Sequence, residues 1–218
     1  METIAFLVDI IIPAFWNGLL VTLALIAVTA PIGLALGIAI ACGRVYGGKF
    51  LSRFFQGYTI FFKGCPLLLL LFILYFGLPP YGITLSPFVA SIIGFILCNS
   101  AYNSEYIRGA ILSVKEGQLT AAKALGMTRN QAIRFVVLPQ ALRRAIPGIS
   151  NEFIYLIKYS SLAYMITVIE LTGAGKLIAT KYFAYNETFF ALAVVYLALV
   201  TITTFGANAI ERKFAIPG

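Results

Sequence analysis

Histidine is absent from this sequence of 218 residues, and only 11% of the residues are charged. Histidine is the commonest general base and metal ligand in proteins, so its absence argues against a metal site and against most enzyme mechanisms. Cys42, Cys65 and Cys98 stand in apolar stretches without the paired spacing of disulfides or metal ligands. Glu2 and Asp9 lie where a signal peptide would carry basic residues, so we expect no cleaved leader. We therefore expect neither an enzyme nor a metalloprotein.

The sequence contains long apolar runs and few charged residues. Apolar residues make up 61% of the chain, and its mean hydropathy is +0.94. These values predict an all-α, polytopic membrane protein. The paired prolines of GLPPYG at 77–82 divide one long uncharged run, because paired prolines end helices. We expect five transmembrane helices, at about 16–42, 57–78, 86–112, 146–169 and 188–210. The fourth contains Glu152 and Lys158, each of which costs about 2.5 kcal/mol or more at mid-membrane.

The basic residues predict the direction of these spans. With five spans, 11 of the 16 lysines and arginines fall in connections on one side, and Lys176 and Lys181 fall on the other. The positive-inside rule then places the N-terminus outside and the C-terminus in the cytoplasm. The net charge of +8 is thus mainly a topology signal, and we expect no nucleic-acid partner. The 11 are Arg44, Lys49, Arg53, Lys115, Lys123, Arg129, Arg134, Arg143, Arg144, Arg212 and Lys213.

The longest cytoplasmic connection, at about 113–145, contains a polar and basic segment. LTAAKALG favours a short helix that ends at Gly126, and TRNQ at 128–131 matches a capping box that would begin a second helix. Pro139 and Pro147 are expected to bend or break the chain before the fourth span. The predicted hairpin is either an amphipathic loop at the membrane surface or a docking element for a soluble partner.

Polar side chains inside the predicted spans are candidate ligands for a substrate. Asn99, Tyr102, Asn103 and Tyr106 follow the spacing of one helix face, and Glu105 lies at its edge. Unpaired polar atoms are costly in lipid, so this face should point into the bundle. The alternative is structural: Glu105 pairs with Arg108, and the hydroxyls and amides only join helices.

Two other predicted spans add candidate groups. Lys158, Ser160 and Ser161 would supply donors near the middle of the fourth span. In the second span, Pro66 has no N–H to donate, so the backbone around Gly64 and Cys65 is expected to be open. Broken helices of this kind offer main-chain groups to a zwitterion.

The segment AAKALGMTRNQAIRFVVLPQA at 121–141 closely resembles the EAA loop of bacterial and archaeal ABC importer permeases. Nearly the whole chain is similar to the polar amino acid permease family, through 17–26, 63–79, 101–118 and 156–166. Three positions depart from that pattern. Thr120 replaces the usual Glu of the loop, Lys63-Gly64-Cys65-Pro66 replaces Arg-Gly-Thr-Pro, and Tyr159 replaces an acidic residue. The last departure argues against a strongly cationic substrate.

The resemblance implies the permease subunit of an ATP-driven importer, a single domain over residues 1–218 in a prokaryotic inner membrane. Two ATPase subunits would bind ATP and Mg, a second permease copy, identical or related, would complete the membrane part, and an extracellular binding protein would deliver a polar amino acid. The implied coupling residues are Gly117, Thr120, Ala121, Ala122, Ala124 and Gly126. The implied substrate residues are Asn99, Tyr102, Glu105, Ser160, Ser161, Lys158, Cys65 and Pro66. This chain needs no cofactor, because LTGAGKL lacks the spacing of a phosphate loop.

Two other functions fit the residues alone. A gradient-driven secondary transporter would also carry polar residues at the membrane midplane, although five spans show no obvious inverted repeat. A membrane scaffold that does not transport could use the loop to recruit a soluble enzyme. Dependence of transport on ATP distinguishes these possibilities.

Overall fold

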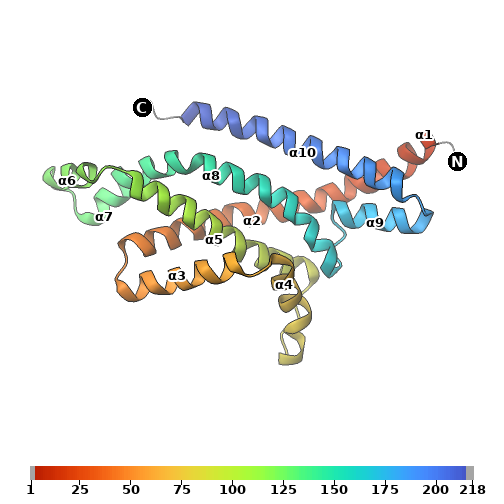
Figure 1. Cartoon of the computed structure of the whole chain (residues 1–218), viewed down its shortest axis with the longest axis horizontal. Coiled ribbons are helices and arrows are strands. Elements are labelled where there is room, and N and C mark those ends of the chain that lie inside the picture. Colours follow the sequence, from red (N-terminus) through yellow and green to blue (C-terminus); the bar gives the residue numbers. More distant parts are fainter. Residues whose placement is uncertain (1–2, 215–218) are drawn as a thin grey trace. The chain divides into compact units, whose positions relative to one another are not determined.

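The computed structural model describes residues 3–214, so Glu2 lies outside the described residues. These residues form helices joined by short turns and include no β-strand, which confirms the all-α class (Figure 1). In chain order the elements are α1 (Thr3–Phe6), η1 (Leu7–Ile11), α2 (Ile12–Tyr46), α3 (Lys49–Gly64), α4 (Leu67–Phe72), η2 (Ile73–Gly77), η3 (Pro79–Tyr81), α5 (Pro87–Ser113), α6 (Glu116–Ala124), α7 (Arg129–Ala132), η4 (Ile133–Val137), α8 (Leu138–Tyr159), η5 (Ser160–Ile166), α9 (Leu171–Tyr182) and α10 (Tyr185–Phe214).

Several helices are long and apolar enough to cross a membrane. Leu7–Tyr46 and Tyr185–Phe214 each qualify alone. Two pairs of helices also qualify when each pair, which is bent at a short break, is taken together: Lys49–Gly64 with Leu67–Gly77, and Arg129–Ile166 with Leu171–Tyr182. By length and composition the described residues thus offer two candidate spans, or up to four if each broken pair is one span. α5 matches the predicted third span closely, and the total of five stays a prediction.

The chain divides into two compact units. The first comprises Met1–Pro31, Cys65–Leu97 and Phe153–Thr203, and the second comprises Ile32–Gly64, Cys98–Glu152 and Thr204–Gly218. α2, α5, α8 and α10 therefore each contribute one part to each unit.

Each unit has its own apolar core. The first unit has one cluster around Leu71 and Phe95 and another around Phe15 and Leu171. The cluster of the second unit is rich in small residues: Ala41, Ala110, Ala141 and Ala145 are all buried in it. Small residues let helices approach closely, which is how helices commonly pack in membranes.

The second unit shows this close approach at Gly37 of α2. A Cβ atom at Gly37 would lie 2.8 Å from the Cβ of Asn103 and 3.1 Å from the carbonyl oxygen of Ser100, both on α5. A larger residue at Gly37 would therefore push the two helices apart. Beyond the turn at Gly47, α3 runs back along the second half of α2 (Figure 1).

The predicted second span, 57–78, is wrong in its start, because α3 already begins at Lys49. The open backbone expected around Gly64 and Cys65 is confirmed, because the helix is interrupted at Cys65 and Pro66. The interruption has a simple cause, because Pro66 has no N–H and its ψ of 126° is not helical. The Pro66 carbonyl then accepts the first hydrogen bond of the next helix, from the N–H of Leu70 at 3.0 Å.

Pro139 and Pro147 were expected to bend or break the chain, and a break is wrong. Helical turns continue from Arg129 to Ile166, and both prolines lie within α8. The π-helical turn η4 ends at Val137, two residues before Pro139, and such wide turns accommodate a missing hydrogen bond. The predicted fourth span, 146–169, ends earlier than expected, because Thr167 adopts φ of 72° and stops the helix.

The helix, turn and helix predicted for the polar connection are present. α6 ends in a Schellman motif, in which the N–H of Gly126 bonds to the carbonyl of Lys123 and the N–H of Met127 to that of Ala122. Gly126 has φ of 86°, which favours glycine. Thr128 and Gln131 then form the predicted capping box at the start of α7.

Candidate functional site

Four buried polar side chains lie on one stretch of α5 in the second unit: Asn99, Ser100, Asn103 and Ser104. Their spacing divides them into two adjacent stripes, one of amides and one of hydroxyls. In lipid such groups must find partners within the protein, because no water reaches them. The prediction that the polar face of this helix points inward is therefore confirmed for Asn99 and Asn103.

The amide stripe leads to a buried carboxylate. Asn103 donates to Asn99 Oδ1 at 2.9 Å, and Asn99 donates to Glu152 Oε1 on α8 at 3.2 Å. Asn103 Oδ1 is buried without a hydrogen-bond partner. Glu152 was not predicted as a site residue, although an acidic residue within a predicted span is the signal that identifies it.

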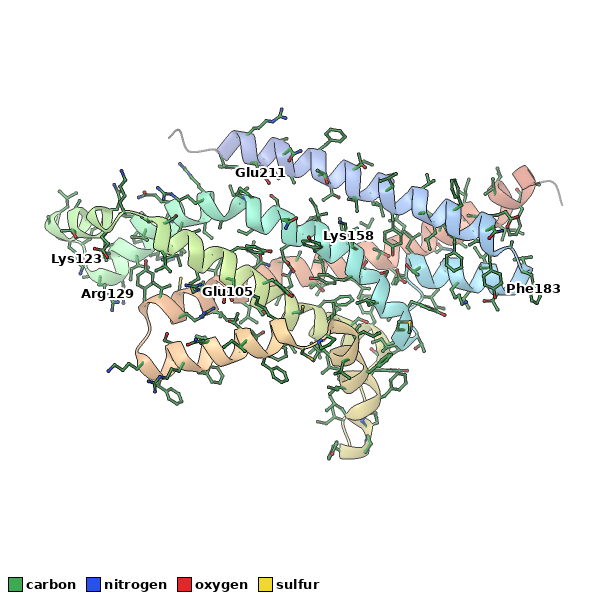
Figure 2. The ribbon with its side chains drawn as sticks, in the orientation of Figure 1. Glu105, Lys123, Arg129, Lys158, Phe183 and Glu211 are labelled. Atoms are coloured by element: carbon green, nitrogen blue, oxygen red, sulfur yellow. The ribbon has the colours of Figure 1, made fainter. Side chains whose placement is uncertain are left out.

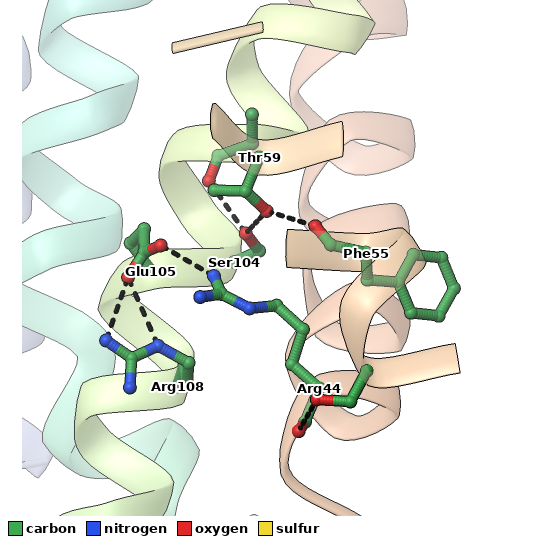
Figure 3. A network of polar contacts seen from close by, with 8 residues as sticks. Arg44, Phe55, Thr59, Ser104, Glu105 and Arg108 are labelled. Carbon is green, nitrogen blue, oxygen red and sulfur yellow. Dashed lines mark hydrogen bonds and ion pairs between the residues drawn. The ribbon is translucent and has the colours of Figure 1, made fainter. Parts of the chain in front are cut away.

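The hydroxyl stripe faces α3. The hydroxyls of Tyr58 and Ser100 lie 2.8 Å apart, and those of Thr59 and Ser104 lie 3.4 Å apart. Thr59 also donates to the carbonyl of Phe55 at 2.8 Å (Figure 3). Hydroxyl pairs between neighbouring helices thus fix α3 against α5.

Glu105 lies between two guanidinium groups (Figure 3). Arg44 of α2 donates to its Oε1 at 2.6 Å, and Arg108 donates to its Oε2 at 3.0 and 3.2 Å. The pairing with Arg108 expected under the structural alternative is present, and Arg44 is a partner that the sequence analysis missed. The two arginines and one carboxylate leave one positive charge in excess.

Two tyrosines of α5 lie beside this cluster. Tyr102 is half-buried, and the ammonium of Lys63 lies 5.6 Å from its ring centroid. Tyr106 packs against Gly148 of α8, where a Cβ would meet its ring at 2.7 Å. Both rings thus help to place α5 next to its neighbours.

The other predicted substrate residues belong to the first unit. Lys158 and Ser161 line a pocket of about 510 Å³ together with Thr172, Tyr196, Leu197 and Val200. Ser161 donates to the carbonyl of Lys158, and the buried Ser160 donates to that of Ile157, both at 2.7 Å. The ammonium of Lys158 lies 5.2 Å from the ring centroid of Tyr155. Lys158 lies near the C-terminal end of α8 (Figure 2).

Cys65 and Pro66 also lie in the first unit, at the interruption between α3 and α4. All three cysteines are free, and Cys65 Sγ approaches only the carbonyl of Pro66, at 3.7 Å, among its hydrogen bonds. The structure therefore gathers Asn99, Tyr102 and Glu105 on α5 and places Lys158 and Ser161 in one pocket. Within residues 3–214, no three Cys, Asp or Glu side chains gather in a way that could hold a metal ion.

The predicted coupling residues lie on α6 and in the turn that joins it to α7. Figure 2 labels Lys123 and Arg129 of the hairpin that α6 and α7 form. Gly117, Thr120, Ala121, Ala124 and Gly126 are exposed. Ala122 is buried and packs within its own unit, so it is not part of the exposed face. Leu125, which the sequence analysis did not single out, is 84% exposed and presents an apolar side chain there.

Comparisons with known proteins agree with this architecture. The family model described as "Binding-protein-dependent transport system inner membrane component" matches residues 33–216. Over 203 residues the chain is 39% identical to the "Probable amino-acid ABC transporter permease protein YckA" of Bacillus subtilis (strain 168), with 93% of this chain and 90% of that protein covered. Over 207 residues it is 33% identical to the "Glutamine transport system permease protein GlnP" of Escherichia coli (strain K12), with 94% of each covered.

Solved structures give the same result. A chain of the "Crystal structure of an amino acid ABC transporter with histidines" is similar with a TM-score of 0.85 at 32% sequence identity, covering 92% of this chain and 94% of that chain. A chain of the MetNI methionine ABC transporter shares the fold with a TM-score of 0.76 at 22% identity, covering 96% of this chain and 98% of that chain.

Proposed function

We propose that this chain, which belongs to the family of binding-protein-dependent transport system inner membrane components, is the permease subunit of an ATP-driven amino acid importer. The family match over residues 33–216 carries the proposal, and the relatives with amino acid transport names support it. The resemblance predicted from the sequence is thereby confirmed, as is the role of a transport subunit in place of an enzyme.

The partners follow from this role. LTGAGKL lacks the spacing of a phosphate loop, and GRVYGGKF at 43–50 has Phe50 where such a loop has Ser or Thr. We therefore assign ATP and Mg to separate ATPase subunits, of which we propose two. A second permease copy, identical or closely related, completes the membrane part, and an extracellular binding protein delivers the substrate. Residues 1–218 form one permease domain in a prokaryotic inner membrane, and its two units are parts of that domain.

The α6 hairpin is the proposed docking element for an ATPase subunit. Its exposed face combines small residues, which allow close approach, with the apolar side chain of Leu125. Gly126 and the Thr128 capping box fix the turn between the two short helices, so the docking face has a defined shape. We assign the contact to the exposed residues Gly117, Thr120, Ala121, Ala124 and Gly126. The buried Ala122 packs beneath this face.

The proposed substrate site is built for the two charges of an amino acid. Glu105 is already paired with the guanidinium groups of Arg44 and Arg108, so this cluster has an excess positive charge, which favours the substrate carboxylate. The buried Glu152, reached through Asn99, is the better partner for the ammonium group. This revises the sequence-based placement of the ammonium near Glu105.

The other predicted residues stay substrate residues of the proposal, each within its own unit. In the second unit, Tyr102 lies beside these groups on α5. In the first unit, donors are supplied by Lys158, Ser160 and Ser161, and main-chain groups by Cys65 and Pro66 at the helix interruption. Tyr159, where many members of the family have an acidic residue, favours a substrate that is not strongly cationic.

The substrate site predicts different effects for two carboxylate variants. Glu152→Gln should lower the apparent affinity for the amino acid by about tenfold, because one charge-assisted contact is lost. Glu105→Gln should mainly lower the free energy of unfolding, because it leaves two guanidiniums without their counter-charge. Uptake and thermal unfolding are measured on both, with the exposed Glu187→Gln as control. A folded Glu152→Gln protein with wild-type uptake and selectivity would refute the site.

The proposed orientation predicts which residues reagents reach from each side. With the native cysteines replaced, Ser113→Cys should react with a membrane-impermeant maleimide only from the cytoplasm, and Thr180→Cys only from outside. Both positions are exposed, so a lack of reaction from one side is caused by the membrane barrier and not by burial within the chain. The opposite pattern would reverse the topology.

The importer function is tested by uptake into liposomes that contain this chain, its ATPase partner and the binding protein. Uptake should require ATP. Ala121→Trp should reduce uptake and stimulated ATP hydrolysis by about tenfold or more, because an indole on the docking face blocks close approach. Ala209→Trp, at an exposed alanine of α10, is the matched control. Uptake driven by an ion gradient without the ATPase would identify a secondary transporter, and absence of uptake would favour a scaffold.

A further inference from the structure

Glu170 is a completely buried carboxylate in the first unit, at the N-terminus of α9. Its Oε2 accepts from the N–H of Thr172, and its Oε1 accepts from the N–H of Gly173, both at 2.9 Å. An acidic N-cap satisfies two free N–H groups of the helix and interacts favourably with its dipole. These two bonds explain why α9 begins here, but they do not account for the other contacts of this carboxylate.

Tyr196 of α10 provides one of those further contacts. Its hydroxyl donates to Glu170 Oε2 at 3.1 Å and lies 2.8 Å from the hydroxyl of Thr172. One tyrosine hydroxyl therefore connects the cap of α9 to α10.

α2 closes the cluster from another direction. Thr22 accepts a hydrogen bond from the N–H of Leu171, the first residue of α9, at 3.1 Å. A Cβ atom at Gly18 would lie 2.9 Å from both the Cβ of Ala174 and the Cα of Leu171. The first turn of α9 thus packs so closely against α2 that no side chain fits at Gly18.

The connection between η5 and α9 is strained. Thr167 is β-branched and adopts φ of 72°, a conformation that costs about 1–3 kcal/mol for such residues. It lies three residues before Glu170, whose bonds to the N–H groups of Thr172 and Gly173 hold the start of α9. Thr172 and Tyr196 also line the pocket of Lys158 and Ser161, which therefore adjoins this cluster.

We infer that Glu170 is a positioning residue that acts through the Tyr196 hydroxyl to hold the wall of the pocket of Lys158 and Ser161 in the geometry that the substrate needs. The inference rests on the proposed transport function. Glu170 does not touch the substrate in this role. Its carboxylate fixes the hydroxyl of Tyr196, and Tyr196 and Thr172 line the pocket together with Lys158 and Ser161.

Two conservative variants separate this role from simple capping of α9. Glu170→Asp keeps a carboxylate that caps helices well but shortens its reach toward Tyr196. Tyr196→Phe removes only the hydroxyl. Each should raise the amino acid concentration for half-maximal uptake by about fivefold to tenfold, with the maximal rate and the yield of assembled transporter little changed. The double variant should be no worse than either single variant, because both remove the same link.

The measurements are made on the complete transporter in liposomes. Tyr185→Phe removes a tyrosine hydroxyl from the exposed start of α10 and serves as the control. Half-saturation values equal to wild type, or effects of the two variants that multiply, would overturn the inference, as would lower stability with unchanged half-saturation. If Glu170→Asp does not assemble, the half-saturation value of Tyr196→Phe alone tests the inference. Loss of ATP-dependent uptake in the wild-type protein would instead refute the proposed function.

Discussion

Polar groups within a membrane must find their partners inside the protein, and this constraint organises both units. In the first unit a buried carboxylate, Glu170, receives donors from α9 and α10, and the next residue, Leu171, donates from its N–H to Thr22 of α2. In the second unit α5 carries amides and hydroxyls that meet α3 and α8, and Glu105 joins α5 to α2. Hydrogen bonds and ion pairs are more directional than apolar contacts, so we propose that the polar contacts specify which arrangement of these helices forms.

The same contacts place the groups proposed to act in transport. Asn99 reaches Glu152 because both lie on inward faces of their helices, and a buried carboxylate among amides is suited to an ammonium group. The cluster of Arg44, Glu105 and Arg108 carries excess positive charge, which is suited to a carboxylate. The exposed small residues of the polar hairpin of α6 and α7 are suited instead to a partner protein.

Local signals were sufficient to predict part of this structure from the sequence. The hairpin was predicted correctly because Gly126 and the Thr128 capping box act within a few residues of the chain. The Arg44 partner of Glu105 was missed because 61 positions separate the two residues, and no local pattern marks such a pair. The continuation of the helix through Pro147 was missed because a single proline gives the same signal whether neighbouring groups compensate for it or not.

The central claim is that polar contacts between helices determine where α5 lies. A double-mutant cycle on Tyr58→Phe and Ser100→Ala tests it most directly, because the two hydroxyls lie 2.8 Å apart on neighbouring helices. The measured quantity is the free energy of unfolding in bicelles for the wild type, both single variants and the double variant. The account predicts a favourable coupling energy of about 0.6 kcal/mol or more between the two side chains. A coupling of zero within error would contradict it and would leave apolar packing as the determinant of the position of α5.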